Sequence, residues 1–130
     1  LVVAGGTHIV VAGVDNLGKS PYAIAAGQAS LLDSASLKFN EALLVAMVDL
    51  GANVLYIDTA FRYNQVINQP ASYGFINSTV AACTTPAASC LPSTAVIDYN
   101  TYVFADDRYF TPAAQRSFGD FAYSRMKTRW

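Results

Sequence analysis

The 130-residue chain carries few charges and a single histidine. Charged residues make up 13% of the sequence, and the formal net charge at pH 7 is -1. This balance gives no reason to expect nucleic acid or an anionic membrane surface as a partner. No apolar run reaches the roughly 18 uncharged residues that a membrane helix needs, so we expect no transmembrane segment. His8 is the only imidazole, but it precedes a strand-like run, which favours a structural role over base catalysis.

Cysteine is also scarce. Cys83 and Cys90 are the only two, and they lie in a segment rich in Ala, Thr, Ser and Pro. A zinc site needs about four ligands and the single histidine is far away in sequence, so a disulfide is favoured over a metal site. Two free thiols are the alternative. A disulfide closing so short a loop stabilises the chain by roughly 2.5 kcal/mol and indicates an oxidising compartment.

Apolar residues, at 53%, are plentiful enough for one folded domain over residues 1–130 with no internal boundary. The β-branched run 7–12 predicts a buried strand of a parallel sheet, followed by a loop at 13–18. Ligands of open α/β sheets bind beyond the carboxyl ends of the strands, so this loop is a candidate cleft wall.

The rest of the chain alternates helix and strand, which predicts an α/β fold with a parallel sheet. An amphipathic helix is expected over 30–50, with Gly51 as its C-cap and a strand at 53–58, giving a β-α-β unit. Further expectations are a helix at 59–68, a packed loop within the uncharged stretch 63–97, a strand at 102–105 and a helix at 112–126. The residues expected to face inward are, in the first helix, Leu32, Ala35, Phe39, Leu43, Ala46 and Leu50; in the loop, Tyr73, Phe75, Ile76 and Val80; and in the last helix, Ala114, Phe118, Phe121, Ala122 and Met126.

The segment from 104 to 115 carries the most specific signal. An acidic pair, Asp106 and Asp107, follows the expected strand and precedes Thr111, a good N-cap, and Pro112, which suits the first helical position. Hydrolases use a carboxylate on such a strand-to-helix turn to orient a catalytic imidazole three residues later. Tyr109 stands at that third position.

These residues resemble the last conserved block of the SGNH or GDSL family of ester hydrolases, in particular the bacterial secreted and autotransporter esterases. The block reads roughly Asp-x-x-His-Pro/Phe-Thr, which places Asp106 at the Asp position and Tyr109 at the His position. Residues 6–21 are similar to the family's strand and its Leu-Pro-Asp-Leu-Gly-x-Thr-Pro loop. Residues 39–44 and 51–54 are similar to its next helix and strand.

The resemblance implies the C-terminal half of a three-layer α/β/α, flavodoxin-like domain. It also implies part of a carboxylic-ester hydrolase that acts on ester or lipid substrates by a Ser-His-Asp acyl-enzyme mechanism, without a cofactor. The family's Ser block would precede Leu1, so a missing N-terminal half, possibly a second chain, is expected. The family points to a secreted, periplasmic or bacterial cell-surface location. Because a phenol with a pKa near 10 cannot replace imidazole as a base, this chain alone should be inactive.

Two other functions stay open. On the first, Tyr109 marks a site that has lost its base, and the chain is an inactive SGNH-like binding or structural module. On the second, the sequence from Gly13 to Ser20 matches the Walker A pattern of a P-loop nucleotide binder, with Asp58 as a magnesium partner, but Pro21 follows at once. No serine among Ser20, Ser30 and Ser78 lies in a nucleophile motif.

Overall fold

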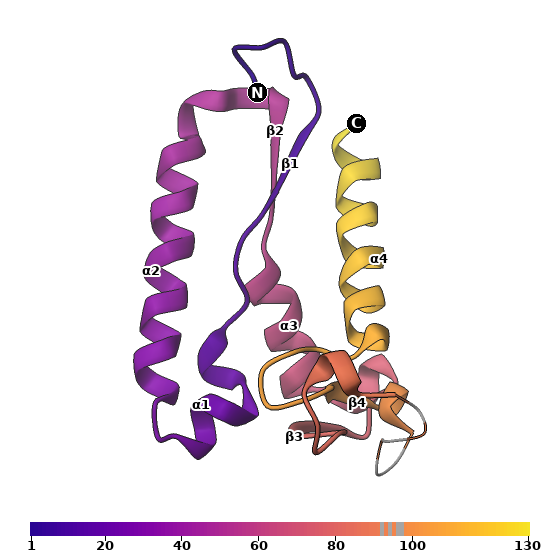
Figure 1. Ribbon diagram of the computed structural model, residues 1–130. Coiled ribbons are helices and arrows are strands. Elements are labelled where there is room, and N and C mark those ends of the chain that lie inside the picture. The colour runs from indigo at the N-terminus through magenta and orange to yellow at the C-terminus, as the bar shows by residue number, and fades with distance from the viewer. Residues whose placement is uncertain (92, 94, 96–97) are drawn as a thin grey trace.

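The computed structural model describes residues 1–91, 93, 95 and 98–130, and it mixes helices with short parallel strands (Figure 1). The α/β class is therefore confirmed. The strands are β1 Ile9–Ala12, β2 Val54–Ile57, β3 Asn77–Ala81 and β4 Tyr102–Phe104; the α-helices are α1 Pro21–Ala25, α2 Ala29–Met47, α3 Thr59–Asn68 and α4 Pro112–Arg129. Short 3-10 segments are η1 Leu17–Lys19, η2 Val48–Asn53, η3 Pro70–Tyr73, η4 Ala87–Ser89 and η5 Tyr99–Thr101. Among the described residues, no helix is long and apolar enough to cross a bilayer.

The strands form two separate parallel pairs. β1 pairs with β2 in register from Ile9–Val54 to Ala12–Ile57, with α2 in the connection, so the predicted parallel β-α-β connection is present. β4 does not extend this pair; it is hydrogen-bonded to β3. The sequence predicted one parallel sheet, and for β4 this prediction is wrong. β3 lies in the stretch expected to be a loop; it begins with three polar residues in succession, which hides the strand pattern.

The closed core lies around β4 and α3. Buried and half-buried rings stack there: Tyr63 lies parallel to Phe110 with centroids 3.7 Å apart, and Phe110 stacks on Phe104 at 5.0 Å. The fully or nearly buried members of this cluster are Tyr63, Val66, Phe75, Val103, Phe104 and Ala114. The predicted loop anchors are correct for Phe75 and Tyr73, whereas Ile76 and Val80 are 65% and 55% exposed.

Helix α4 begins as predicted. The Thr111 hydroxyl accepts a hydrogen bond from the Ala114 N–H at 3.2 Å and donates one to the Tyr102 carbonyl at 2.7 Å. Pro112 occupies the first turn, where its missing N–H costs nothing. All five residues predicted to face inward are buried or half-buried. The cap therefore fixes the helix to the end of β4.

Helix α2 is where the predicted inward face is only partly correct: Leu32 and Leu43 are half-buried as expected. The helix forms, but Ser36 and Asn40 are buried while Ala35, Phe39 and Ala46 are exposed. Polar side chains face inward because they hydrogen-bond the backbone of the 13–18 loop. The large apolar side chains that this turns outward are Leu31, Leu37, Phe39, Leu44 and Val45.

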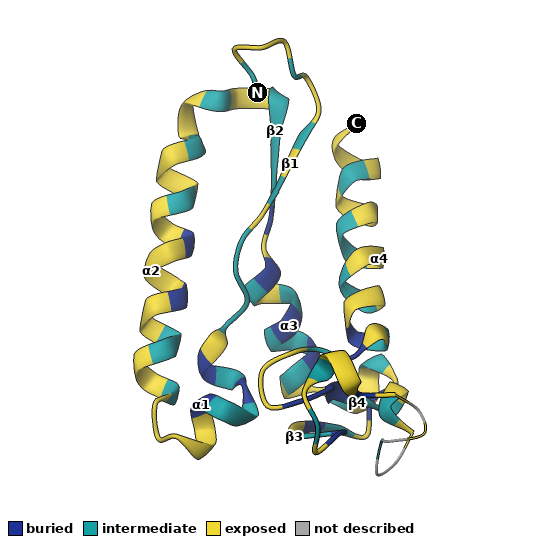
Figure 2. Ribbon diagram, in the orientation of Figure 1, coloured by how far each residue is buried: buried dark blue, intermediate teal, exposed yellow. Residues whose placement is uncertain are grey.

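At the end of the molecule where both termini lie, the residues are mostly exposed or half-buried (Figure 2), and we call this the open end. β1 was predicted to be buried, yet Val10 is 41% exposed and Ala12 is also exposed, because β1 has β2 as its only paired strand in the described chain. Gly51 does not cap α2, which ends at Met47 with Val48 as its cap. It lies instead inside η2 with φ 58°, a conformation that favours glycine.

Candidate functional site

The turn after β4 is built on the carboxylate of Asp106. One oxygen, Oδ1, accepts hydrogen bonds from the N–H groups of Arg108 at 2.9 Å and Tyr109 at 2.7 Å. The Ala105 N–H donates to the Tyr109 carbonyl at 2.7 Å, which closes the turn back onto the strand. An aspartate that bonds the backbone two and three residues later is a common way to hold such a turn. The positions of Arg108 and Tyr109 therefore depend on this one side chain.

The second oxygen of Asp106 reaches a different segment. Oδ2 accepts a hydrogen bond from the Ala87 N–H at 2.6 Å, and the residue is 7% exposed. Burial acts to raise the pKa of Asp106, but the hydrogen bonds from Tyr109, Arg108 and Ala87, with the nearby Arg108 charge, outweigh it. The pKa of this carboxyl is consequently lower than its ordinary value. It is held as an anion at neutral pH.

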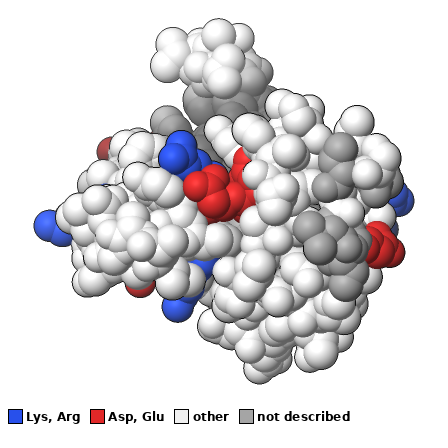
Figure 3. All heavy atoms as spheres, turned by 60° about the horizontal axis from the view of Figure 1, so that its bottom comes forward, with Lys and Arg blue, Asp and Glu red and all other residues white. Residues whose placement is uncertain are grey.

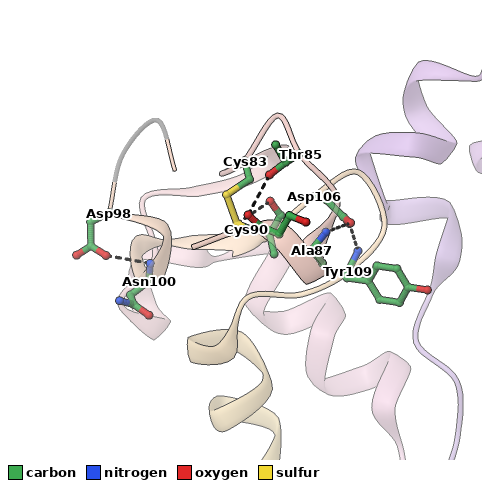
Figure 4. The surroundings of a disulfide bond; sticks show 10 residues. Cys83, Thr85, Ala87, Cys90, Asp98, Asn100, Asp106 and Tyr109 are labelled. Carbon is green, nitrogen blue, oxygen red and sulfur yellow. Dashed lines mark hydrogen bonds between the residues drawn. A yellow bond between two sulfur atoms is a disulfide. The ribbon is translucent and has the colours of Figure 1, made fainter. Parts of the chain in front are cut away.

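Tyr109 contacts the Asp106 carboxylate through its backbone N–H and not through its ring. Its ring is turned away from Asp106 (Figure 4) and the residue is 63% exposed. The two predicted site residues are therefore adjacent, and Asp106 orients position 109 by bonding its N–H rather than its side chain.

The 106–109 turn and the 13–22 segment meet at one hollow of about 430 Å³. The Tyr22 N–H donates to the Asp107 carbonyl at 2.8 Å, and the Arg108 guanidinium lies 4.3 Å from the centre of the Tyr22 ring. The hollow is lined by Asp15, Leu17, Ser20, Tyr22, Leu32, Arg108, Tyr109, Phe110 and Gln115. Two segments some 90 residues apart in sequence thus form the walls of one largely apolar hollow.

Helix α2 holds the first of these segments in place. The Asn40 side chain bonds both backbone groups of Val14: its Oδ1 accepts from the N–H and its Nδ2 donates to the carbonyl, each at 2.9 Å. Ser36 Oγ accepts from the Leu17 N–H at 3.1 Å. Gly13 permits this approach, because a Cβ there would lie 2.7 Å from Asn40 Oδ1. The buried polar stripe of α2 is therefore what positions the loop.

Asp15 is the acidic group of the hollow. Its burial raises the pKa above the ordinary value, against the opposing effect of a hydrogen bond from its own backbone. Burial also raises the pKa of the neighbouring Tyr63 phenol, and the charge of Asp15 adds to this. A carboxyl at the wall of an apolar hollow suits a ligand group that donates a hydrogen bond.

The side chains of His8, Ser20 and Ser78 have structural partners. His8 contacts Thr7 at 3.1 Å and packs edge-on against Trp130, whose ring centre is 4.7 Å away. Ser20 donates to the Leu17 carbonyl and caps α1 by accepting from the Ala23 N–H. Ser78 donates to the Ile67 carbonyl at 2.8 Å. The Ser20 cap also bears on the Walker A pattern, since its hydroxyl serves a helix of only five residues.

The predicted disulfide is present. Cys83 and Cys90 are bonded, with their Cα atoms 5.7 Å apart, and both are buried. Among the described residues, no group of three or more His, Cys, Asp or Glu side chains is arranged to hold a metal ion. Figure 3 shows a face of the molecule that is mainly uncharged, with acidic and basic side chains lying next to each other near its centre.

Comparison with known proteins adds no identity: no protein-family model matches the chain, and no curated protein matches it either. Sequence reasoning selected Asp106, Tyr109 and the 13–18 loop, but it missed Tyr22 and the disulfide loop as neighbours of the turn. The contact with Tyr22 had one sequence signal, Arg108, which lies between the two selected residues and whose guanidinium packs on the Tyr22 ring. No local pattern pointed to the Ala87 N–H.

Proposed function

We propose that this chain is the C-terminal part of a secreted carboxylic-ester hydrolase similar to the SGNH family, acting by an acyl-enzyme mechanism on ester or lipid substrates. The observation that supports it most is the meeting of the 13–22 and 106–109 segments at one apolar hollow. The resemblance was carried by these two segments, and a hydrolase of this kind needs both at its cleft. The hollow's largely apolar wall suits an acyl group.

In this proposal Asp106 orients the backbone at position 109. The general base that accepts the proton of the serine hydroxyl is supplied by another residue or has been lost. A Tyr109 phenol at neutral pH keeps its proton and cannot accept one from a serine hydroxyl. The nucleophilic serine belongs to the N-terminal part of the domain, which the proposal places on another polypeptide or another stretch of the protein. The disulfide supports a secreted, periplasmic or cell-surface location, because such bonds persist in oxidising compartments.

The exposed surface supports a missing partner. The chain exposes 7789 Å², whereas a compact monomer of its mass exposes about 6,700 Å². The difference exceeds the roughly 800 Å² that each partner buries in an ordinary interface. The uncovered surface includes the apolar side chains on the outer side of α2 and the edge of β1 that no described strand pairs with. We propose that the N-terminal part of a three-layer α/β/α domain covers it.

The test is turnover of a p-nitrophenyl ester by this chain together with whatever polypeptide co-purifies with it. Intact-mass analysis identifies that polypeptide first. Tyr109→His restores an imidazole at the base position and is expected to raise turnover at least tenfold, while Tyr109→Phe leaves it unchanged. Absence of turnover in all three proteins, with a partner present, would contradict the enzyme proposal.

A binding module is the second candidate function. It is favoured by the exposed Tyr109 ring, which lines the hollow without contacting a base. On this proposal a non-hydrolysable ester analogue binds the wild type, and Tyr109→Ala weakens binding without any turnover being measurable. A nucleotide with magnesium is expected to leave the melting temperature unchanged, because Ser20 already caps α1; a rise would revive the P-loop alternative.

A further inference from the structure

The disulfide loop packs directly on the residue that begins the site turn. Cys83 and Cys90 are 4% and 8% exposed and form a small buried cluster with Ala105. The Cys83 N–H donates to the Ala105 carbonyl at 2.9 Å, and Cys90 Sγ lies 3.7 Å from the same oxygen. Ala105 is the residue before Asp106. The loop is thus in contact with the backbone from which the carboxylate projects (Figure 4).

Ala87, at the middle of this loop, provides the bond to Asp106 from outside the turn. Oδ1 of Asp106 is used by Arg108 and Tyr109, within the turn itself. Oδ2 accepts from the Ala87 N–H, 19 residues earlier in the chain. One oxygen therefore shapes the turn, and the other attaches it to the disulfide loop.

We propose that the loop closed by Cys83 and Cys90 is a positioning element of the site: it holds the Ala87 N–H on Asp106 and thereby fixes where Arg108 and Tyr109 stand at the hollow. Opening the disulfide releases this constraint, so the site responds to thiols. The inference concerns the geometry of the turn, and it holds whether or not the protein hydrolyses esters.

The chemical step is thiol–disulfide exchange. A thiolate attacks one sulfur of the Cys83–Cys90 bond, the S–S bond breaks, and the other cysteine leaves as a thiolate that takes up a proton. A second thiol group resolves the mixed disulfide. With dithiothreitol the two cysteines are reduced to thiols, and one reductant molecule is oxidised to its cyclic disulfide.

The alternative is that the disulfide only stabilises the folded chain by restricting the unfolded one. In that case Asp106 would have the same environment whenever the chain is folded. The two ideas differ in what happens to the carboxylate of a folded protein that lacks the Ala87 hydrogen bond. Loss of a hydrogen bond to the charged form disfavours that form, so the positioning role predicts a higher pKa for Asp106.

Ala87→Pro tests the hydrogen bond through which the loop acts, and reduction of the folded wild type tests the disulfide itself. Proline removes the N–H and leaves both cysteines in place. Pro86, which precedes it, has ψ 149°, a backbone conformation that a following proline favours. Position 87 opens η4, where proline is tolerated as the first helical residue. Ala87→Gly keeps the N–H and is the matched control.

The readouts are the Asp106 carboxyl titration followed by carbon-13 NMR and the amide resonances of Arg108 and Tyr109. With the disulfide intact, Ala87→Pro is expected to raise the Asp106 pKa and to shift both amides, while Ala87→Gly leaves them at wild-type values. Dithiothreitol is expected to move the wild-type signals in the same direction, with little further change in Ala87→Pro.

An unchanged Asp106 titration and unchanged amides in folded Ala87→Pro would overturn the proposal. Amides in β1 and α3 report whether each sample is folded. If reduction unfolds the wild type, the stabilising role of the disulfide accounts for the effect of the thiol, and the proposed positioning role of the disulfide is overturned.

Discussion

The region around Phe104 and the region around α2 are built from similar apolar residues and packed in opposite ways. In the first, Phe104 and Val66 are at most 1% exposed, enclosed by β4, α3 and α4. In the second, Val45 is 72% exposed and Phe39 is 53% exposed on the outer side of α2. Apolar content therefore does not decide burial here. Burial follows from which surfaces find a partner, and the inner side of α2 is held by polar bonds instead.

The largest change in unfolding free energy is expected when one phenylalanine is replaced in each region. Phe104→Ala is expected to lower the free energy of unfolding by about 3–5 kcal/mol, because it removes a fully buried ring from a stacked cluster. Phe39→Ala, the matched change on the open face, should cost less than about 1 kcal/mol, as is usual for exposed positions. Urea unfolding measures both. Equal losses would show that the isolated chain covers α2 in solution.

A second test sharpens the role of the polar side of α2. Asn40→Ala leaves the Val14 N–H and carbonyl without their partner, so we expect a loss of about 1–3 kcal/mol in unfolding free energy. Asn40→Asp keeps an acceptor for the N–H but cannot donate to the carbonyl, and it should not restore wild-type stability. Ser34→Ala, on the exposed side of the same helix, is the control. Amide shifts in the 13–18 loop should accompany the loss at Asn40 alone.

A third test concerns the junction between β4 and α4. Thr111→Ala removes the cap on the Ala114 N–H and the bond to the Tyr102 carbonyl, which is expected to cost about 1–2 kcal/mol. Thr111→Ser retains the hydroxyl and should stay close to the wild type in a thermal melt. A serine variant as unstable as the alanine variant would mean that the methyl group, rather than the cap, matters.

The smallest expected effect is a pH dependence that arises in the closed region. The folded pKa of Asp106 is lower than its unfolded value, so the carboxylate stabilises the fold fully above the unfolded pKa near 4. This contribution is lost as the pH falls through the lower, folded pKa. Asp106→Asn should therefore flatten the slope of stability against pH between about 5 and 2. An unchanged slope would contradict the depressed pKa.

Much of the element pattern could be predicted because local signals were strong. The helix Thr59–Asn68 has the predicted bounds, and Thr111 with Pro112 identified the start of α4. The parallel pairing of β1 and β2 followed from the helix between them. These are properties of neighbouring residues in the chain.

The features that could not be predicted are long-range. Asn40 has no sequence signal for bonding the backbone of Val14, 26 residues away. Periodicity alone placed Ala35 and Phe39, which are exposed, on the inner face of α2. Likewise β3 became a strand only because β4 offered it an edge. At the candidate site, Asp106 and Tyr109 could be selected from a short motif, but the Ala87 bond required the disulfide loop to fold onto Ala105.

Because Trp130 packs against His8, its fluorescence reports on the open end of the molecule. Trp130 is the only tryptophan of the chain, and it packs against the only histidine, His8, at the end of the molecule where both termini lie (Figure 1). Tryptophan fluorescence therefore follows that end, while near-ultraviolet circular dichroism follows the packing of the tyrosines, among them Tyr63 stacked on Phe110 in the closed core. A single unlabelled sample thus contains two independent probes, and their coincidence or separation during melting reveals whether the chain unfolds as one cooperative unit.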